Sequence, residues 1–332
     1  MASEQSWEDT PIAAAARRAA MVRTPNALKM PKPDSPRVIT ISNQKGGVGK
    51  TTSCVNLAAA LVIGGLRALV IDLDPQGNAS TALGVDHHVG TTSSYEMLIG
   101  QATAAEAMQP STFHENLLCI PATIDLAGAE IELVSMVRRE YRIVDAINPD
   151  FLAEHNIDYV FIDCPPSLGL LTINAMTAST EVLIPIQCEY YALEGVGQLL
   201  NSISMIREHL NHKLHISTIL LTMYDARTKL ANQVATEVQE HFGSVVLNTI
   251  IPRSVKVSEA PGYSQTVLAY DPGSPGASAY VDAANEMAVR GDYLPTPESG
   301  AIGVAPELHG LDVTEDAAEN ADSAEDTHEG DN

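Results

Sequence analysis

A glycine-rich turn between an apolar strand and a helix constrains this chain more than any other feature. Residues 38–42 form a short run of mostly β-branched side chains, and residues 51–63 have helical periodicity. The segment between them contains Lys45-Gly46-Gly47-Val48-Gly49-Lys50-Thr51-Thr52. Glycines let backbone N–H groups curl around phosphate oxygens without Cβ clashes, and the helix N-terminus adds positive potential. A strand, a glycine-rich loop and a helix in this order predict a nucleotide-binding loop with ATP and Mg²⁺ as cofactors.

The residue types in this loop suit phosphate chemistry. Lys50 would place its charge at the β- and γ-phosphates, and Thr51 would offer a hydroxyl to magnesium. The spacing departs from the common GxxxxGK[ST] form, because Gln44 stands where a glycine is usual and Lys45 adds a second lysine. The loop is therefore a variant of the P-loop, with a lysine at its start.

Acidic residues follow two other apolar runs. Asp72 and Asp74 lie at the end of residues 68–73, and Asp163 follows residues 159–162. Carboxylates at the C-terminal ends of parallel strands face the ligand crevice of such a sheet. Asp72 alternates to the other side of its strand, so we expect it to support the site from outside.

Strand and helix patterns alternate through the body of the chain. Further strands are predicted at 117–121, 181–186, 216–223 and 245–251, and helices at 193–209, 229–242 and 276–290. Continuous apolar strands alternating with helices indicate an α/β fold with a mainly parallel sheet and helices on both faces.

The chain divides into three parts by composition. Residues 1–36 form an extension with a possible short helix at 11–21 and four prolines after it, which we expect to be flexible or to bind a partner. Residues 37–293 form the predicted ATPase domain. Residues 294–332 are polar and acidic, so a disordered tail is expected.

Charge and apolar content limit the partners. The net charge is −23, and without residues 297–332, which contain 11 acids and no Lys or Arg, the remainder is still −12. Any DNA contact must therefore come from a local basic patch. No apolar run is long enough for a transmembrane helix, and the N-terminus lacks a secretory signal. The four separated cysteines, with no CxxC pair, fit buried thiols in a reduced cytoplasm.

The string KGGVGKTT is a deviant Walker A motif, and here the chain resembles the ParA/MinD group of P-loop ATPases. The segments DLDPQGNAS (72–80), DCPPSLGLLTINA (163–175), LLTMYDART (220–228) and IPRSVKVSEAP (251–261) resemble the ParA/Soj family of chromosome-partitioning ATPases within that group. The resemblance implies a homodimer in the ATP state, in which Lys45 acts on the partner's nucleotide. It also implies that Asp163 holds magnesium and that Asp74 is both a magnesium-site residue and the group that orients the attacking water.

The same resemblance implies further contacts and partners. Arg227 and Lys256 match DNA-contacting positions, and Met223 and Pro252 match positions around the adenine. The expected partners are non-specific double-stranded DNA and a ParB-like centromere-binding protein that stimulates hydrolysis and release; the expected location is the nucleoid, without a membrane. No NKxD guanine motif is present, which favours ATP over GTP. Lys213 and Lys229 are further candidate DNA contacts, and Arg253 could instead support the nucleotide pocket.

Three other functions share some of these features. A MinD-like positioning regulator would need a basic amphipathic C-terminal helix, which the acidic tail does not provide. An iron–sulfur reductase with the same loop would need cysteines that bridge two subunits. A scaffold that uses nucleotide only as a clamp would not need both Asp74 and Asp163.

Overall fold

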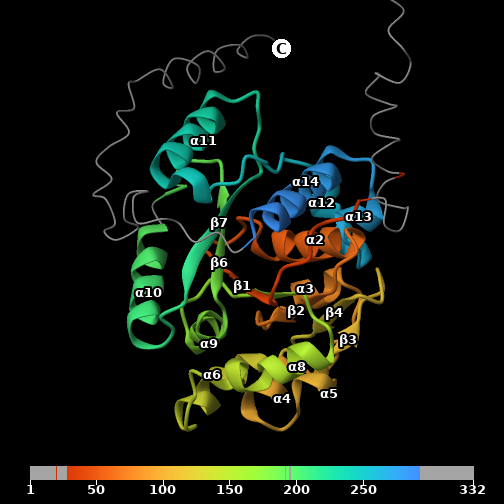
Figure 1. Cartoon of the computed structure of the whole chain (residues 1–332), viewed down its shortest axis with the longest axis vertical. Coiled ribbons are helices and arrows are strands. Elements are labelled where there is room, and N and C mark those ends of the chain that lie inside the picture. Colours follow the sequence, from red (N-terminus) through yellow and green to blue (C-terminus); the bar gives the residue numbers. More distant parts are fainter. Residues whose placement is uncertain (1–19, 21–27, 191, 194–195, 292–332) are drawn as a thin grey trace, which may run out of the picture.

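A seven-stranded sheet organises the part of the chain that the structure, a computed structural model, describes: residues 20, 28–190, 192–193 and 196–291. The strand order is β3-β4-β2-β5-β1-β6-β7 (Figure 1). The strands are β1 (Arg37–Ile41), β2 (Ala68–Asp72), β3 (Gln109–Pro110), β4 (Leu117–Ile120), β5 (Tyr159–Asp163), β6 (Glu181–Gln187) and β7 (His215–Thr222).

Short and long helices connect these strands. Those before β6 are α2 (Lys50–Ile63), α3 (Asn78–Ala82), α4 (Ser94–Ile99), α5 (Ala104–Ala107), α6 (Leu126–Val134), α7 (Arg142–Ala146), α8 (Pro149–Glu154) and α9 (Leu170–Ala178). Those after β6 are α10 (Val196–His209), α11 (Lys229–Phe242), α12 (Val255–Glu259), α13 (Val267–Tyr270) and α14 (Pro275–Arg290), with 3₁₀ turns η2 (Gly243–Val245) and η3 (Ala260–Tyr263).

Both faces of the sheet are covered, which confirms the predicted α/β architecture. β3 runs antiparallel to β4, and the other strand pairs are parallel. On β1, Ile39 and Ile41 pack in the same core cluster as α2 and α14, whereas Val38 packs in the cluster of α4, α6 and α9. Figure 1 shows α2 and α14 on one side of the sheet and α4, α6 and α8 on the other. This double burial is why the strand sequences are continuously apolar.

The connections place a crevice beside β1. The helix after β1, α2, packs on one face, while the helix after β5, α9, packs in the cluster of the other face. β1 and β5 are neighbours in the sheet, so their outgoing chains separate at the carboxyl ends of the strands. Ligands of open α/β sheets bind at such a point.

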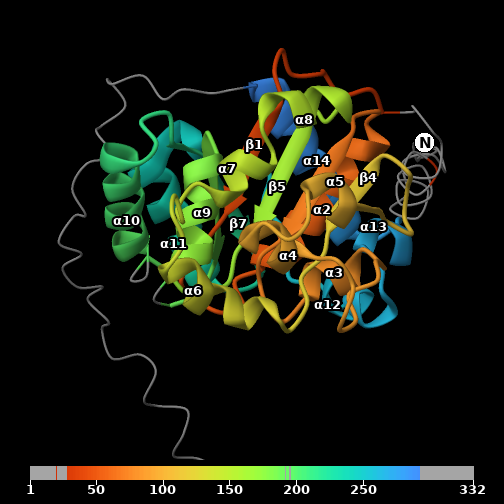
Figure 2. The same ribbon diagram turned by 90° about the horizontal axis from the view of Figure 1, so that it is seen from below.

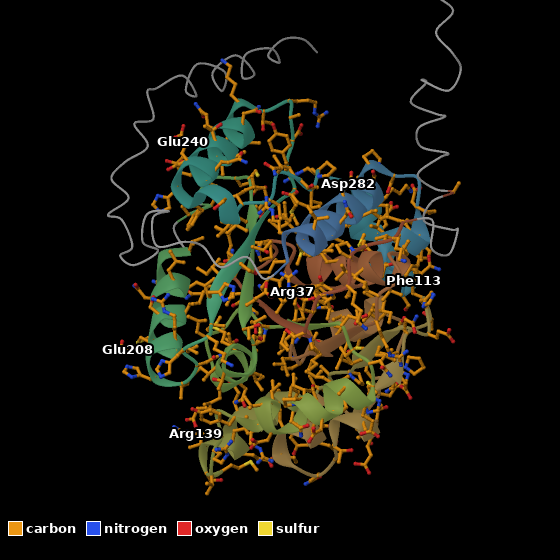
Figure 3. The ribbon with its side chains drawn as sticks, in the orientation of Figure 1. Arg37, Phe113, Arg139, Glu208, Glu240 and Asp282 are labelled. Carbon is orange, nitrogen blue, oxygen red and sulfur yellow. The ribbon has the colours of Figure 1, made fainter. Side chains whose placement is uncertain are left out.

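A buried ion pair closes the opposite ends of the strands. Arg37 is 3% exposed and donates to both carboxylate oxygens of Glu181, at 2.7 and 2.6 Å, and to the carbonyl of Met287 on α14 at 2.9 Å. Burial alone would lower the pKa of Arg37, but the hydrogen bonds and charge of Glu181 raise it above its ordinary value. Figure 3 shows Arg37 near the centre of the molecule, where it joins β1, β6 and α14.

One predicted strand is wrong. Residues 245–251 form no strand: after η2, Val246 makes an isolated bridge to β7, and the N–H groups of Leu247 and Ile251 donate to the carbonyls of Ile219 and Leu221 at 2.9 Å each. Two amides between them, of Asn248 and Thr249, donate instead to the carboxylate of Glu286 on α14, at 2.8 and 3.0 Å. A side chain from a distant helix therefore satisfies the groups that a strand ladder would need. The short helices α3 to α8 and strand β3 were not predicted.

Two described residues of the N-terminal extension contact the body. Met30 is 3% exposed, and its backbone N–H donates to the carbonyl of Gly64 at the end of α2 at 3.0 Å. Lys32 pairs with Asp158 at 2.8 Å. Apart from Ala20, the helix predicted at 11–21 lies outside the described residues, and so does the predicted tail at 294–332.

Candidate functional site: a phosphate-binding loop

The glycine-rich loop after β1 is anchored to the neighbouring strands. Asn43 donates to the carbonyl of Pro185 on β6 at 2.8 Å and accepts the backbone N–H of Lys45 at 3.0 Å. Thr222 at the end of β7 donates to the carbonyl of Val48 at 2.8 Å. Gly47 and Gly49 have φ values of 74° and 88°, which side chains with a Cβ rarely adopt. These contacts hold the loop in a curled conformation.

The helix that follows leaves its N-terminus open to a ligand. α2 begins at Lys50, and its first turn has neither a side-chain cap nor an acidic residue. A Cβ added at Gly46 or Gly47 would meet no atom within 4 Å. Free N–H groups and open space at a helix N-terminus suit an anion such as phosphate.

Lys50 lies inside this loop. It is 7% exposed, and its Nζ donates to the carbonyl of Lys45 at 3.2 Å. Burial lowers the pKa of Lys50, and the nearby charges of Asp163 and Asp74 oppose that shift. A buried ammonium held by a single carbonyl has remaining donors for phosphate oxygens.

Asp163 offers an unpaired carboxylate oxygen next to a hydroxyl. It ends β5, in register with Ile41 of β1 and Asp72 of β2. Thr51 donates to its Oδ2 at 2.7 Å, while its buried Oδ1 has no hydrogen-bond partner. Burial, followed by the charge of Asp72, raises the pKa of Asp163 well above its usual range. A hydroxyl and an unpaired carboxylate are oxygen ligands of the kind Mg²⁺ prefers, so these residues fit a magnesium ion.

Asp72 and Asp74 differ in their surroundings. Asp72 is fully buried and accepts the N–H and hydroxyl of Ser80 at 2.9 and 2.7 Å and the N–H of Asp74 at 3.1 Å; burial raises its pKa to about 6. It therefore holds the turn, in the supporting position expected. Asp74 is half-buried, and its Oδ1 accepts the N–H of Gln76 at 3.0 Å. The charge of Asp74 acts on both Lys50 and Asp163.

Met223 and Pro252 lie on the β7 side of the loop. Met223 adopts a left-handed backbone with φ 52°, and its Cε would lie 3.9 Å from a Cβ at Gly49. Pro252 pairs with the next residue, Tyr224, in an isolated bridge. Met223 therefore lies beside the loop, and Pro252 lies beside the residue that follows Met223.

The two predicted DNA contacts lie outside the loop and each has an acidic partner. Arg227 donates to both oxygens of Asp225 at 2.9 and 2.7 Å, which lowers the pKa of Asp225 to about 2. Lys256 pairs with Glu259 at 3.0 Å. Both basic side chains are on the surface. Their acidic partners did not enter the sequence interpretation.

Three positioning residues also escaped the sequence interpretation: Asn43, Ser80 and Thr222. Asn43 directly precedes the loop, so its position is a signal that could have been used; Thr222 is recognisable only in the fold. The four cysteines are free and buried. Cys119 and Cys164 are at most 1% exposed, which places their thiols out of reach of a bridge between subunits. Within the described residues, no helix is both long and apolar enough to cross a membrane.

Comparisons with known proteins identify the family of the chain. A family described as an AAA domain matches residues 36–216. The sporulation initiation inhibitor protein Soj of Bacillus subtilis is 51% identical over 77% of this chain and 99% of its own. The chromosome partitioning protein ParA of Myxococcus xanthus is 47% identical over 76% of this chain and 88% of its own.

Solved structures show the same architecture. A Mycobacterium smegmatis protein described as cobyrinic acid a,c-diamide synthase, with bound ATP analogue and magnesium, has a TM-score of 0.65 at 38% identity; the match covers 77% of this chain and 95% of that one. The cell division ATPase MinD of Pyrococcus furiosus has a TM-score of 0.59 at 28% identity, covering 75% and 97%. By its identity to these relatives over most of its length, the protein belongs to the ParA/Soj family of chromosome-partitioning ATPases.

Proposed function

We propose that this protein is a DNA-partitioning ATPase that binds ATP with Mg²⁺, pairs with a second copy, binds DNA without sequence preference and leaves it after hydrolysis. The observation that carries the proposal is the buried Oδ1 of Asp163. This oxygen has no hydrogen-bond partner, while the other carboxylate oxygen, Oδ2, accepts the Thr51 hydroxyl. A buried carboxylate oxygen is costly unless a ligand satisfies it. The ATP analogue and magnesium in the related M. smegmatis protein support the same assignment.

In this proposal the loop residues bind the phosphates of ATP, and the carboxylates position magnesium and the attacking water. Lys50 and the N–H groups of residues 46–52 hold the phosphates, while Thr51 and Asp163 hold magnesium, which would neutralise developing phosphate charge. Asp74 also belongs to the magnesium site and orients the attacking water. Met223 and Pro252 contact the adenine. Lys45 is half-buried at the start of the loop and reaches the partner's nucleotide as a cationic finger.

A substitution at Gly46 tests directly whether two subunits pair. Its added Cβ would meet nothing within 4 Å in one copy, and its backbone is outside the left-handed region. Gly46→Val is therefore tolerated by the monomer, so loss of pairing would report a close approach of two subunits. We expect this variant to bind ATP but to remain monomeric in light scattering. ATP-dependent dimers of normal affinity would refute the close approach.

DNA binding tests the proposed function as a whole. Arg227 and Lys256 would contact phosphates, and pairing would place two copies of each along one duplex. We expect binding with ATP, and little with ADP or without nucleotide, to several unrelated duplexes. Arg227→Ala should weaken all of them and make the salt dependence shallower. The matched control is Arg207→Ala, an exposed arginine on α10. Equal binding with ADP, or preference for one sequence, would contradict the proposal.

The remaining partners follow from the family. A ParB-like centromere-binding protein would stimulate hydrolysis, and non-specific DNA binding would place the protein on the nucleoid in the cytoplasm. Turnover with and without such a partner, in the presence of DNA, tests this part. A rate that the partner does not change would remove it from the proposal.

A further inference from the structure

The outer side of α6 and the residues next to it carry apolar side chains that no other described part of the chain covers. Ile124, Ile131, Val134 and Val137 are 58%, 79%, 60% and 85% exposed. Ala127, between them, is also exposed. We name these five residues the outer stripe. Single exposed hydrophobics are common, but several within fourteen positions indicate an interaction surface.

This helix is apolar on two sides. Leu126, Ala129 and Leu133 face the core and are fully buried. Residues 124, 127, 131 and 134 recur at helical spacing and occupy the opposite side. A surface helix of a monomer normally places polar residues on that side. The outer stripe therefore has the composition of a covered surface.

The stripe lies at the same edge of the sheet as the phosphate-binding loop. Ala122, just before it, donates to Ser80, which in turn donates to Asp72. Glu130 of α6 accepts the N–H of Leu171, at the start of the helix that follows Asp163, at 3.5 Å. In Figure 2 the arrow of β5 points toward the side of the molecule where α3, α6 and α12 lie.

The surface is held in place rather than loosely attached. Arg139 donates to the carbonyl of Val134 at 3.1 Å, and the carbonyl of Arg139 accepts Asn174 of α9 at 2.7 Å. Tyr95 of α4 donates to Glu132 at 2.7 Å. Figure 3 shows Arg139 at the outer margin of the molecule, near this helix. Little ordering would be needed on binding, which lowers the cost of association.

We propose that the outer stripe is buried against a second copy of this chain in the ATP-bound dimer. This inference rests on the proposed function. A stable interface needs about 800 Å² per partner, which is more than a stripe of five side chains presents, so the stripe must be part of a larger surface. The loop lies at the same edge of the sheet, and there Gly46 and Gly47 leave open space. A two-fold dimer that joins two loop edges brings the same edge of each copy, stripe included, to the interface.

The experiment compares matched substitutions at the two edges. Val137→Glu and Ile131→Glu place a charge in the stripe, whereas Val289→Glu places it on α14, where Val289 is 68% exposed. Val289 lies near Met287, whose carbonyl binds Arg37 at the opposite edge. With a slowly hydrolysed ATP analogue, sedimentation at several concentrations should show dimerisation about tenfold weaker or worse for the stripe variants and unchanged for Val289→Glu.

Three readouts separate the outcomes. All variants should bind nucleotide as monomers and melt at the parental temperature. The milder substitution Ile131→Ala should weaken dimerisation less than Ile131→Glu. It keeps the test valid if a glutamate at this position perturbs the fold. Parental dimerisation by the stripe variants would overturn this inference and leave the proposed function intact. Normal dimerisation with lost stimulation by a ParB-like partner would also overturn it, by assigning the stripe to that partner. An unmodified protein that stays monomeric with ATP would overturn both.

Discussion

At the N-terminal ends of the strands, Arg37 and Glu181 form a closed pair, whereas at the carboxyl ends Asp163 keeps a buried oxygen without a partner. Both edges bury charge in the same sheet. The first edge satisfies its charge with a bidentate contact, a tyrosine hydroxyl and a backbone carbonyl. The second places Lys50, Asp72 and Asp163 close together. Burial lowers the pKa of Lys50 and raises the pKa of each aspartate, so it favours the neutral form of all three.

The difference separates structure from function. A completed buried pair holds elements together, because losing either partner leaves a stranded charge. An incomplete cluster costs stability and persists where a ligand completes it. Substitutions at the loop edge should therefore impair activity while leaving the fold intact, and substitutions at the pair should do the reverse.

The largest effect is expected at Lys45. Lys45→Ala should lower ATP turnover by roughly 10³–10⁵-fold, the usual contribution of a cationic finger, with an unchanged melting temperature. Steady-state phosphate release with DNA and partner present measures it. Lys29→Ala removes an exposed lysine elsewhere and should leave turnover unchanged. A loss of only a few-fold for Lys45→Ala would contradict the finger assignment.

The next effect is on stability. Glu181→Ala should lower the free energy of unfolding by about 3–5 kcal/mol, because it strands the buried guanidinium of Arg37. Replacing both Arg37 and Glu181 by leucine should recover most of that loss. Chemical denaturation measures both variants, and nucleotide affinity of the folded fraction should match the parent. If the double variant is as unstable as the single one, the loss of stability comes from lost packing and not from the stranded charge of Arg37.

A smaller effect, of opposite sign for stability and function, is expected at Asp163. Asp163→Asn removes a buried charge that lacks a partner at Oδ1, so the nucleotide-free protein should gain about 1 kcal/mol. The same change should abolish magnesium-dependent nucleotide binding. Denaturation without nucleotide and titration with a fluorescent ATP analogue measure the two. A variant that loses stability without nucleotide would show that this edge is already complete.

The smallest effect concerns the proposed DNA contacts. Asp225→Asn releases Arg227 from its exposed pair, and such pairs are worth about 0–1 kcal/mol, so affinity for DNA in the presence of ATP should rise at most about fivefold. Glu240→Gln removes the same charge from α11, where Figure 3 shows Glu240, without releasing an arginine. An equal rise in both variants would point to net charge instead of Arg227.

The pair of Asp225 with Arg227 also predicts how DNA binding depends on pH. The hydrogen bonds and charge of Arg227 lower the pKa of Asp225 to about 2. The pair is thus formed above the ordinary pKa of an aspartate and is lost only as the pH falls toward 2. DNA affinity between pH 6 and 8 should therefore not change through Asp225.

The sequence by itself determined the parts that are local. Eight contiguous residues, 45–52, specify the loop, because glycine conformations and a helix start depend on near neighbours. The alternation of apolar strands and helices specified a parallel sheet covered on both faces, since both signals repeat within each segment. The strand-end carboxylates at 72, 74 and 163 followed from the same topology.

Tertiary structure decided what depends on distant partners. Glu286 captures the amides of Asn248 and Thr249 and so prevents the strand predicted there. Asp225 and Glu259 pair with the basic side chains predicted to face DNA. The orphan oxygen of Asp163, the closed pair of Arg37 with Glu181 and the uncovered stripe on α6 likewise depend on which side chains meet in space. Arg37 and Glu181 are 144 positions apart, and a pattern that repeats every two or four residues carries no information about such contacts.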